Sequence, residues 1–213
     1  MKKYLTVFFF LQLIVLASCT TDADDEWNAA EVCPESGRGT FVDERDGQTY
    51  KYTTIGNQVW MAQNLNYHVE KGDKCMYEDD DCALKGRLYN IENIFDACPN
   101  GWHLPSNEEW MKMLKKMGGT DIAGARLKAR EGWLESNPGE PSNGTDDCEF
   151  SVLPTLSEMV KYDGYEADIW AKITYKESGK TFLWDAVFYS SADSVFTVEM
   201  GAGPNYSVRC VKD

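Results

Sequence analysis

Apolar residues repeat with a helical period in one stretch near the middle of the chain. They occupy positions i, i+3, i+4 and i+7, which lie on one face of an α-helix: Trp110, Met113, Leu114 and Met117. Ser106 stands before this stretch and Glu109 comes three residues later, the spacing of a capping box. The pattern predicts an amphipathic helix that begins after Ser106 and ends at Gly118-Gly119.

Strand-like runs, rich in β-branched and aromatic residues, lie on both sides of this helix. Residues 49–55 and 58–65 are joined by a Gly-Asn turn, so they predict a β-hairpin. A second, shorter helix is expected at residues 122–129, with Leu127 facing inward. Further strands are expected in the last third of the chain, at residues 151–153, 188–190, 195–200 and 206–211. Short strands around one or two helices indicate an α+β domain.

The first residues have a hydropathy pattern of their own. Lys2 and Lys3 precede an apolar run at residues 4–17, which is shorter than the roughly 20 residues that a membrane-spanning helix needs. Small residues then lead to Cys19, and the segment Leu-Ala-Ser-Cys resembles the lipobox of bacterial lipoproteins. The resemblance implies a signal peptide at residues 1–18, a lipid on Cys19 and anchorage to the outer membrane. An ordinary secretory leader with a coincidental cysteine is the alternative.

Residues 19–39 are acidic and lack a sustained periodicity. We expect them to form a tether between the lipid and a single folded domain at residues 40–213. The acidic run behind Cys19 is similar to the surface-export signals of some Gram-negative lipoproteins, and a plain solvated linker is the alternative.

Net charge limits the partners of this domain. The whole chain has a formal net charge of −14, and loss of Lys2 and Lys3 with the signal peptide leaves 19 basic residues against 35 acidic ones, or −16. Such a surface repels phosphate backbones and anionic lipids. It excludes nucleic acid as a partner and leaves membrane attachment to the lipid.

Six cysteines follow Cys19, and an even number in an exported chain predicts three disulfides. Cys75 and Cys82 flank a short acidic run and form the obvious local pair. A Cys98–Cys210 bridge would tie the middle of the domain to its last strand, and Cys33 with Cys148 is the pair that remains. Six cysteines allow fifteen connectivities, so the sequence leaves the pairing open. No cysteines have zinc-like spacing.

Several segments, in order along the chain, resemble the Fibrobacter succinogenes major paralogous domain. These are DGQTYKYTTIGNQVWMAQNLNY, KGRLYNIENIFDACPNGWHLPSNEEW, FSVLP, FYSSAD and YSVRCVKD. The resemblance runs from Phe41 to Asp213 and implies an exported lipoprotein domain. The activity of this family is not established, so the resemblance implies location and fold more than function.

A more distant likeness rests on GWHLPSNEEW and the closing VRCV, which are similar to segments of formylglycine-generating-type domains. It implies a C-type-lectin-like single domain with two helices, short twisted antiparallel strands and stabilising disulfides. In such a fold the terminal strands pair, which would place the early hairpin beside residues 206–211 and would suit a Cys98–Cys210 bridge. The likeness concerns the fold and does not transfer activity.

Candidate catalytic residues are few. His68 and His103 are the only histidines, and no nucleophile motif supports a pairing of His103 with Ser106, Ser190 or Ser191. We interpret His103 as a structural, hydrogen-bonding residue. The reactive cysteines of formylglycine-generating enzymes are not recognisable, so we expect a protein that is not an enzyme.

Calcium is the one metal that the sequence suggests. Residues 140–147 resemble the Glu-Pro-Asn segment and the later acidic residues of calcium-dependent lectins, and Asp185 could add a ligand from another strand. The candidate ligands in the loop are Glu140, Asn143, Asp146 and Asp147. A solvated acidic loop is the alternative.

Aromatic residues in the last part of the chain suggest carbohydrate as a ligand, because sugars stack on exposed rings. The candidate residues are Trp170, Trp184 and Tyr189, whereas the four earlier tryptophans at positions 60, 102, 110 and 133 are assigned to the core. The sequence therefore favours a non-catalytic polysaccharide-binding module at the cell surface. The alternatives are an interaction module for envelope proteins and an enzyme related to formylglycine-generating proteins.

Overall fold

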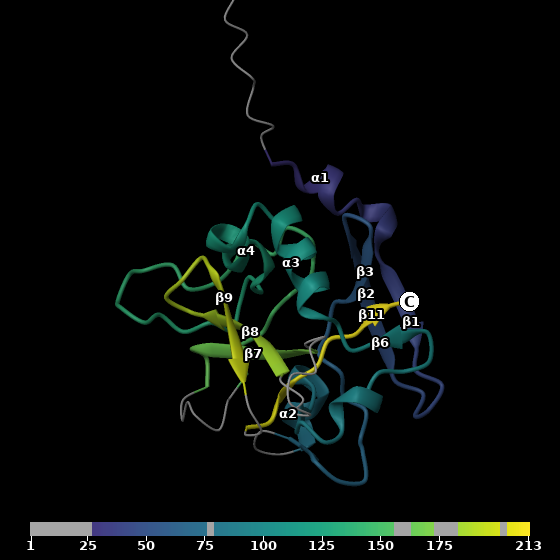
Figure 1. Cartoon of the computed structure of the whole chain (residues 1–213). Helices are drawn as coiled ribbons and strands as arrows, with labels where there is room; N and C mark the ends of the chain where they lie inside the picture. The colour runs from purple at the N-terminus through teal and green to yellow at the C-terminus, as the bar shows by residue number, and fades with distance from the viewer. Residues whose placement is uncertain (1–26, 76–78, 156–162, 173–182, 201–203) are drawn as a thin grey trace, which may run out of the picture.

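The computed structural model describes residues 27–75, 79–155, 163–172, 183–200 and 204–213 (Figure 1). Its helices are α1 (Ala29–Val32), α2 (Asp79–Lys85), α3 (Asn107–Lys116) and α4 (Thr120–Leu127), with 3-10 turns η1 (Glu35–Gly37) and η2 (Ile94–Asp96). Together with two β-sheets and three disulfides they form a mixed α+β fold, which confirms the predicted class.

The first sheet is built on the predicted hairpin. Its five strands have the order β1-β2-β3-β11-β6, with β1 at Gly39–Val42, β2 at Thr49–Ile55, β3 at Gln58–Met61, β6 at Trp102–His103 and β11 at Val211–Lys212. Ile55 pairs with Gln58 across a turn in which Gly56 has a φ of 62°. Val211 lies between Trp60 and His103, so the last strand pairs with the early hairpin as expected.

The second sheet contains the longest strands of the late part of the chain. Its order is β4-β5-β10-β7-β8-β9, with β4 at Asp73–Lys74, β5 at Leu88–Tyr89, β7 at Glu166–Lys172, β8 at Leu183–Tyr189, β9 at Val195–Met200 and β10 at Tyr206–Ser207. Among the strands of this second sheet, only β9 has the predicted bounds. The expected strand 188–190 is the end of a longer β8, β7 was not expected, and residues 151–153 contribute a single bridge between Val152 and Lys128.

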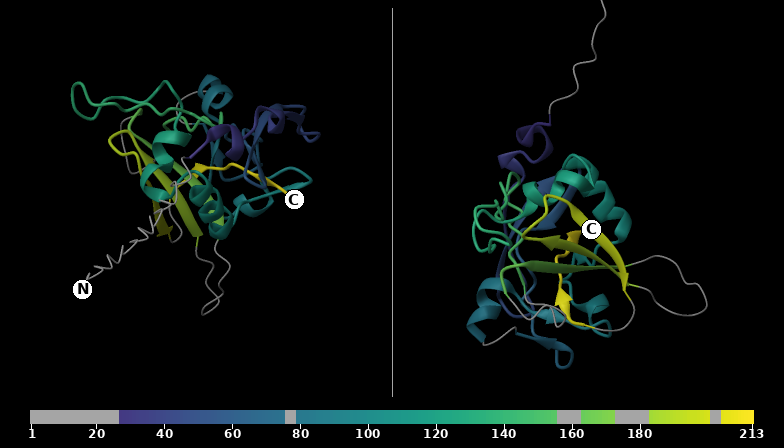
Figure 2. Two further views of the ribbon diagram at one scale, coloured as in Figure 1. Left: turned by 90° about the horizontal axis from the view of Figure 1, so that it is seen from above. Right: turned by 90° about the vertical axis from the view of Figure 1, so that its left-hand side faces the viewer.

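Helix α3 begins where the sequence predicted, with both hydrogen bonds of the Ser106–Glu109 capping box present. Its predicted apolar face is fully buried: Trp110, Met113, Leu114 and Met117. Helices α3 and α4 lie against the β7–β9 side of the second sheet (Figures 1 and 2). In α4 the predicted inward residue Leu127 is buried, and Gly124 lets the helix approach the carbonyl oxygen of Asp193.

The segment after β9 differs from its prediction. Instead of one strand at 206–211, the structure has β10 in the second sheet and β11 in the first, so the end of the chain connects the two sheets (Figure 2). Residues 208–210 between them are buried in the interior. Every residue from Tyr206 to Val211 is buried, so the run resembles one continuous strand although it passes from one sheet to the other.

The three disulfides have the pairing that the sequence favoured: Cys33–Cys148, Cys75–Cys82 and Cys98–Cys210. The first of these overturns part of another prediction, because the tether was expected to reach residue 39. Residues 27–39 instead pack on the domain, where Cys33 is buried and the Trp27 indole donates a hydrogen bond to the carbonyl of Lys116. Residues 1–26, including Cys19, lie outside the described residues, and within the described ones no helix is long and apolar enough to cross a bilayer.

His103 connects β6 to the start of α3, which agrees with a structural role. Its Nδ1 lies 2.7 Å from Asp213 Oδ1, and its Nε2 lies 2.9 Å from Glu109 Oε1. Burial alone would raise the pKa of Glu109, but hydrogen bonds from Ser106 and His103 lower it overall. At pH values above the ordinary pKa of a glutamate, the ionised Glu109 carboxylate therefore stabilises the folded state. This contribution is lost as the pH falls.

Replacing Glu109 with Gln is expected to lower the free energy of unfolding by about 1 kcal/mol at pH 7, because the variant loses the charge-assisted contacts at the cap. Urea denaturation at several pH values measures this effect, and the difference from the native protein should shrink below about pH 4. Glu108→Gln removes the same charge from the exposed side of the same helical turn. An equal loss in both variants would contradict a specific role for Glu109.

Candidate binding site

A cavity of about 680 Å³ opens beside the first sheet, and we call it the Arg209 pocket. Strands β1 and β2, the segment after β3, helix α2 and the loop at residues 146–153 all contribute to its lining, with Arg209 at its base. Its volume falls within the range of roughly 300–1,000 Å³ that is typical of sites for small ligands.

Arg209 organises the base of this pocket. The side chain is 1% exposed, and its Nε donates to Asn64 Oδ1 at 2.7 Å. Its Nη2 donates to the carbonyl of Ser151 at 2.9 Å, and its Nη1 donates to the carbonyl of Phe150. Burial lowers the pKa of Arg209 to about 9, which still leaves the guanidinium charged at neutral pH. All three contacts are made to neutral groups.

The loop that forms one wall is held in an unusual backbone conformation. Asp146, Glu149 and Ser151 have positive φ angles of 47°, 51° and 53°, although none of them is glycine. Such conformations cost of order 1–3 kcal/mol each and persist only where the surroundings fix them. Here the Asp146 carboxylate accepts hydrogen bonds from the backbone N and the hydroxyl of Ser151, and Cys148 is bonded to Cys33.

Basic side chains surround the mouth of the pocket. Arg38 forms an ion pair with Glu149 at 2.8 Å. Lys51 and Arg130 are exposed, and neither forms an ion pair with any residue that the structure describes. Arg130 uses its Nε to hydrogen-bond the carbonyl of Thr145, which leaves its terminal nitrogens toward solvent. The lining thus contains four basic and two acidic side chains.

The predicted calcium ligands are not assembled into a site. Asp146 is buried and bonded to Ser151, burial raises its pKa, and Asn143 accepts a hydrogen bond from the backbone of Trp133. Glu140 is exposed and bonded to Asn137, and Asp147 joins no cluster with it. Across the described ranges no three His, Cys, Asp or Glu side chains are arranged to hold a metal ion. The structure therefore does not bring the predicted ligands together, because Asn143 and Asp146 use their oxygen atoms in hydrogen bonds within the protein.

Two of the three aromatic candidates are also core residues. Trp170 is fully buried and donates its indole N–H to the carbonyl of Tyr89, and Trp184 is 8% exposed, with its ring 6.5 Å from that of Trp110. Neither ring is available for stacking on a sugar. Tyr189 is partly exposed beside Phe196, and the pocket does not include it.

A group of acidic residues lies on the opposite face of the second sheet from α3. Asp168 and Asp185 are 3% and 1% exposed, and each has one carboxyl oxygen without a hydrogen-bond partner among the described residues. Burial, and then repulsion by neighbouring Glu166 and Asp185, raises the pKa of Asp168 to about 9. Asp168 is therefore protonated at neutral pH and shares its proton with its acidic neighbours.

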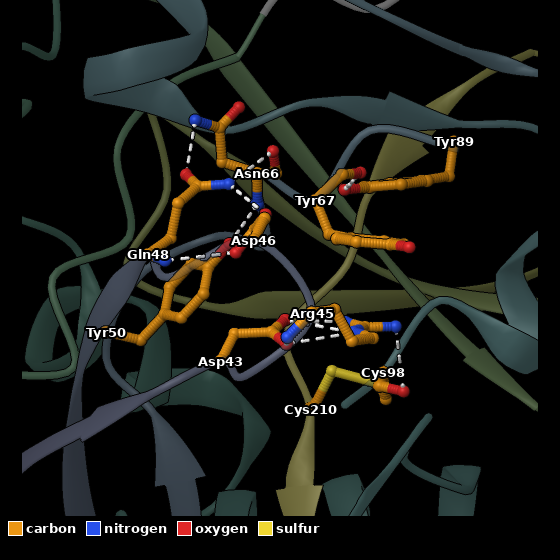
Figure 3. Close-up of polar contacts among 10 residues, drawn as sticks. All are labelled: Asp43, Arg45, Asp46, Gln48, Tyr50, Asn66, Tyr67, Tyr89, Cys98 and Cys210. Carbon is orange, nitrogen blue, oxygen red and sulfur yellow. Dashed lines mark hydrogen bonds and ion pairs between the residues drawn. A yellow bond between two sulfur atoms is a disulfide. The ribbon is translucent and has the colours of Figure 1, made fainter. Parts of the chain in front are cut away.

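Figure 3 shows a second polar cluster, around Arg45 in the turn between β1 and β2. Arg45 forms an ion pair with Asp43 at 2.7 Å, donates to the carbonyl of Cys98 at 3.3 Å and stacks 3.7 Å above the Tyr67 ring. Burial alone would raise the pKa of Asp43, but hydrogen bonds and the charge of Arg45 lower it overall. Because Arg45 uses its donors within the protein, we interpret this cluster as structural.

Tyrosine hydroxyls extend the same cluster toward the second sheet (Figure 3). Tyr50 accepts a hydrogen bond from the backbone of Asn66, and Tyr89 donates to the carbonyl of Tyr67 at 2.6 Å. Burial raises the pKa of Tyr50 to about 12 despite that hydrogen bond. Together with the contacts of Arg45, they hold the turn between β1 and β2 close to the Cys98–Cys210 disulfide.

The model of the Fibrobacter succinogenes major domain matches residues 53–212, and the chain belongs to this family. No curated protein matches the chain. No solved structure matches it either. Three segments that carry the family resemblance meet at the Arg209 pocket, where they contribute Asn64, Ser151 and Arg209.

The sequence did not reveal this pocket. Arg209 stands between Val208 and Cys210 in an otherwise apolar run, and a lone basic residue at such a place was the one available signal. Nothing in the sequence indicated left-handed conformations at residues 146–151, because no glycine marks them.

Asp168 offers a test of the acidic group. Its folded-state pKa lies above the ordinary value, so the native protein loses stability as the pH rises from about 4 toward 9. Asp168→Asn cannot ionise and is expected to raise Tm by about 2–4 °C at pH 8, with little difference near pH 4. Thermal unfolding followed by circular dichroism measures this, with exposed Glu199→Gln on β9 as the control. A lower Tm for Asp168→Asn at pH 8 would contradict the assignment.

Proposed function

We propose that this protein is a non-catalytic binding module of the bacterial envelope and that the Arg209 pocket binds a polysaccharide. The observation that carries the proposal is the pocket itself, whose walls combine hydroxyl, amide and charged groups with apolar surface. Sugars present hydroxyl groups that donate and accept hydrogen bonds, together with apolar C–H faces. A site for them therefore needs both kinds of group.

The lining offers both kinds. Hydroxyl and amide groups come from Thr40 and Gln63, and apolar surface comes from Leu84 and Leu153. Leu84 is 69% exposed, so its side chain offers an apolar surface to the C–H face of a sugar. The Tyr52 ring lies over Gly39, on the face of β2 opposite to Lys51, and is not part of this surface.

Rigidity also supports this proposal. The pocket walls include two β-strands and a loop that Arg209 and the Cys33–Cys148 disulfide hold in place. A ligand that enters a preformed site loses less free energy to ordering the protein than one that must organise a mobile loop.

The pairing of the early hairpin with β11 supports the finer fold proposal, a C-type-lectin-like domain. All six cysteines from Cys33 to Cys210 are paired, which favours a binding role over thiol chemistry of the formylglycine-generating type. Attachment to the outer membrane through Cys19 is proposed from the lipobox-like sequence.

Replacing Leu84 with Ala is expected to weaken retention on insoluble plant or bacterial polysaccharides by about tenfold, because the lost apolar contact contributes on the order of 1 kcal/mol or more. Full-length protein in mild detergent is used, and Met111→Ala is the matched control, since Met111 is an exposed apolar residue outside the pocket. Retention should be equal with calcium and with EDTA. A loss confined to Met111→Ala, or calcium-dependent retention, would overturn the pocket assignment.

Replacing Cys19 with Ser is expected to move the protein from the membrane fraction to the soluble fraction, because no lipid can be attached. Cell fractionation and the mass of the N-terminal peptide measure the change. A native N-terminal peptide that does not begin at Cys19, or that carries no added lipid mass, would argue against lipid anchoring.

A second candidate function is binding to envelope proteins. Strand β9 is at the edge of the second sheet, and its Phe196 and Val198 are 47% and 40% exposed. An open edge with apolar side chains favours pairing with a strand of another protein. If Phe196→Asp loses binding to envelope proteins but keeps its retention on polysaccharide, this role is separate from that of the pocket.

A further inference from the structure

The charge of the Arg209 pocket is opposite to the charge of the whole protein. The chain has a formal net charge of −14, whereas the pocket lining has four basic and two acidic side chains. One basic residue, Arg38, is paired with Glu149. The excess therefore belongs to Arg209, Lys51 and Arg130, opposed by the single carboxyl of Asp146.

The charge of Arg209 is not compensated by direct contact. Its three hydrogen bonds go to an amide oxygen and two carbonyl oxygens, and no ion pair of Arg209 occurs among the described residues. Asp146 interacts with Arg209 only through its electrostatic field, without a direct contact. Burial raises the pKa of the Asp146 carboxyl. A buried charge is poorly screened by solvent, so its field extends into the cavity above it.

Lys51 and Arg130 provide the groups that would contact a ligand. Both line the pocket and are exposed, and they come from separate elements, β2 and the segment after α4. The terminal nitrogens of Arg130 form a planar pair of donors that matches the two oxygens of a carboxylate. The Lys51 ammonium adds a second, more flexible contact.

From this arrangement we infer that the Arg209 pocket selects an acidic sugar, with Lys51 and Arg130 binding its carboxylate. This inference rests on the proposed polysaccharide-binding function and specifies its ligand class. Neutral sugars use the hydroxyl and amide groups of the walls equally well, but only an acidic sugar gains from the excess positive charge.

The acidic surface restricts the size of that ligand. Beyond a screening length of about 8 Å at physiological ionic strength, a polyanion meets the negative charge that dominates the protein. The pocket therefore favours a short acidic oligosaccharide, or the end of a chain, over a long polyanion.

The test measures binding of full-length protein in mild detergent to short oligogalacturonides and to the same oligosaccharides with methyl-esterified carboxylates. Isothermal titration calorimetry gives the affinities. The native protein is expected to bind the free acid at least about tenfold more tightly than the ester, and the preference should decrease as salt rises. Sulfated oligosaccharides and free acetate form two further arms, which separate the carboxylate from other anions and from an isolated anionic group.

Lys51→Gln/Arg130→Gln is expected to remove the preference for the free acid. Its control, Lys112→Gln/Lys115→Gln, removes the same charge from the exposed face of α3 and should keep the preference. Arg130→Lys should retain part of it. Thermal unfolding verifies that each variant folds.

Equal affinity for acid and ester in the native protein would overturn this inference and leave the proposed function standing. Equal losses in the two double variants would overturn it as well, since the charge effect would then be general. Binding of acetate with the same affinity as the oligosaccharide, or tighter binding of sulfated chains, would contradict an acidic sugar as the ligand. Binding of no saccharide of any kind would overturn the proposed function too.

Discussion

The guanidinium of Arg209 has to be solvated by the protein itself, because the side chain is almost completely buried. Asn64, Phe150 and Ser151 supply the oxygens, and they come from segments that lie far apart in the chain. An unpaired buried charge costs several kcal/mol, so these segments are held together strongly once the fold forms. Arg209 also lies between β10 and β11, so the same contacts fix the connection between the two sheets.

The loop opposite Arg209 depends on that interaction. Three residues in left-handed conformations within six positions would not persist in an unsupported loop. The hydrogen bonds from Arg209 to the carbonyls of Phe150 and Ser151, the Asp146–Ser151 contacts and the disulfide at Cys148 fix this conformation together. The result is a rigid wall with polar groups directed into a cavity, which is the property that the proposed binding role requires.

Charge is distributed unevenly over this fold. Acidic side chains dominate the composition, and some, such as Asp168 and Asp185, are buried on one face of the second sheet, where burial raises the pKa of both carboxyl groups. The uncompensated basic groups gather at the Arg209 pocket. A locally positive cavity on an acidic protein attracts small anions at short range, while the rest of the surface repels large ones.

Local patterns in the sequence determined helix α3, the β2–β3 hairpin and β9, and with them the α+β class and the family resemblance. They could do so because a capping box, a helical period or a turn depends only on neighbouring residues. The disulfide pairing was favoured by position along the chain. Only the tertiary structure decided that Trp170 and Trp184 are core residues, that residues 27–39 pack on the domain and that the last strand is divided between two sheets. The Arg209 pocket belongs with these, because its groups converge through long-range packing that no local pattern records.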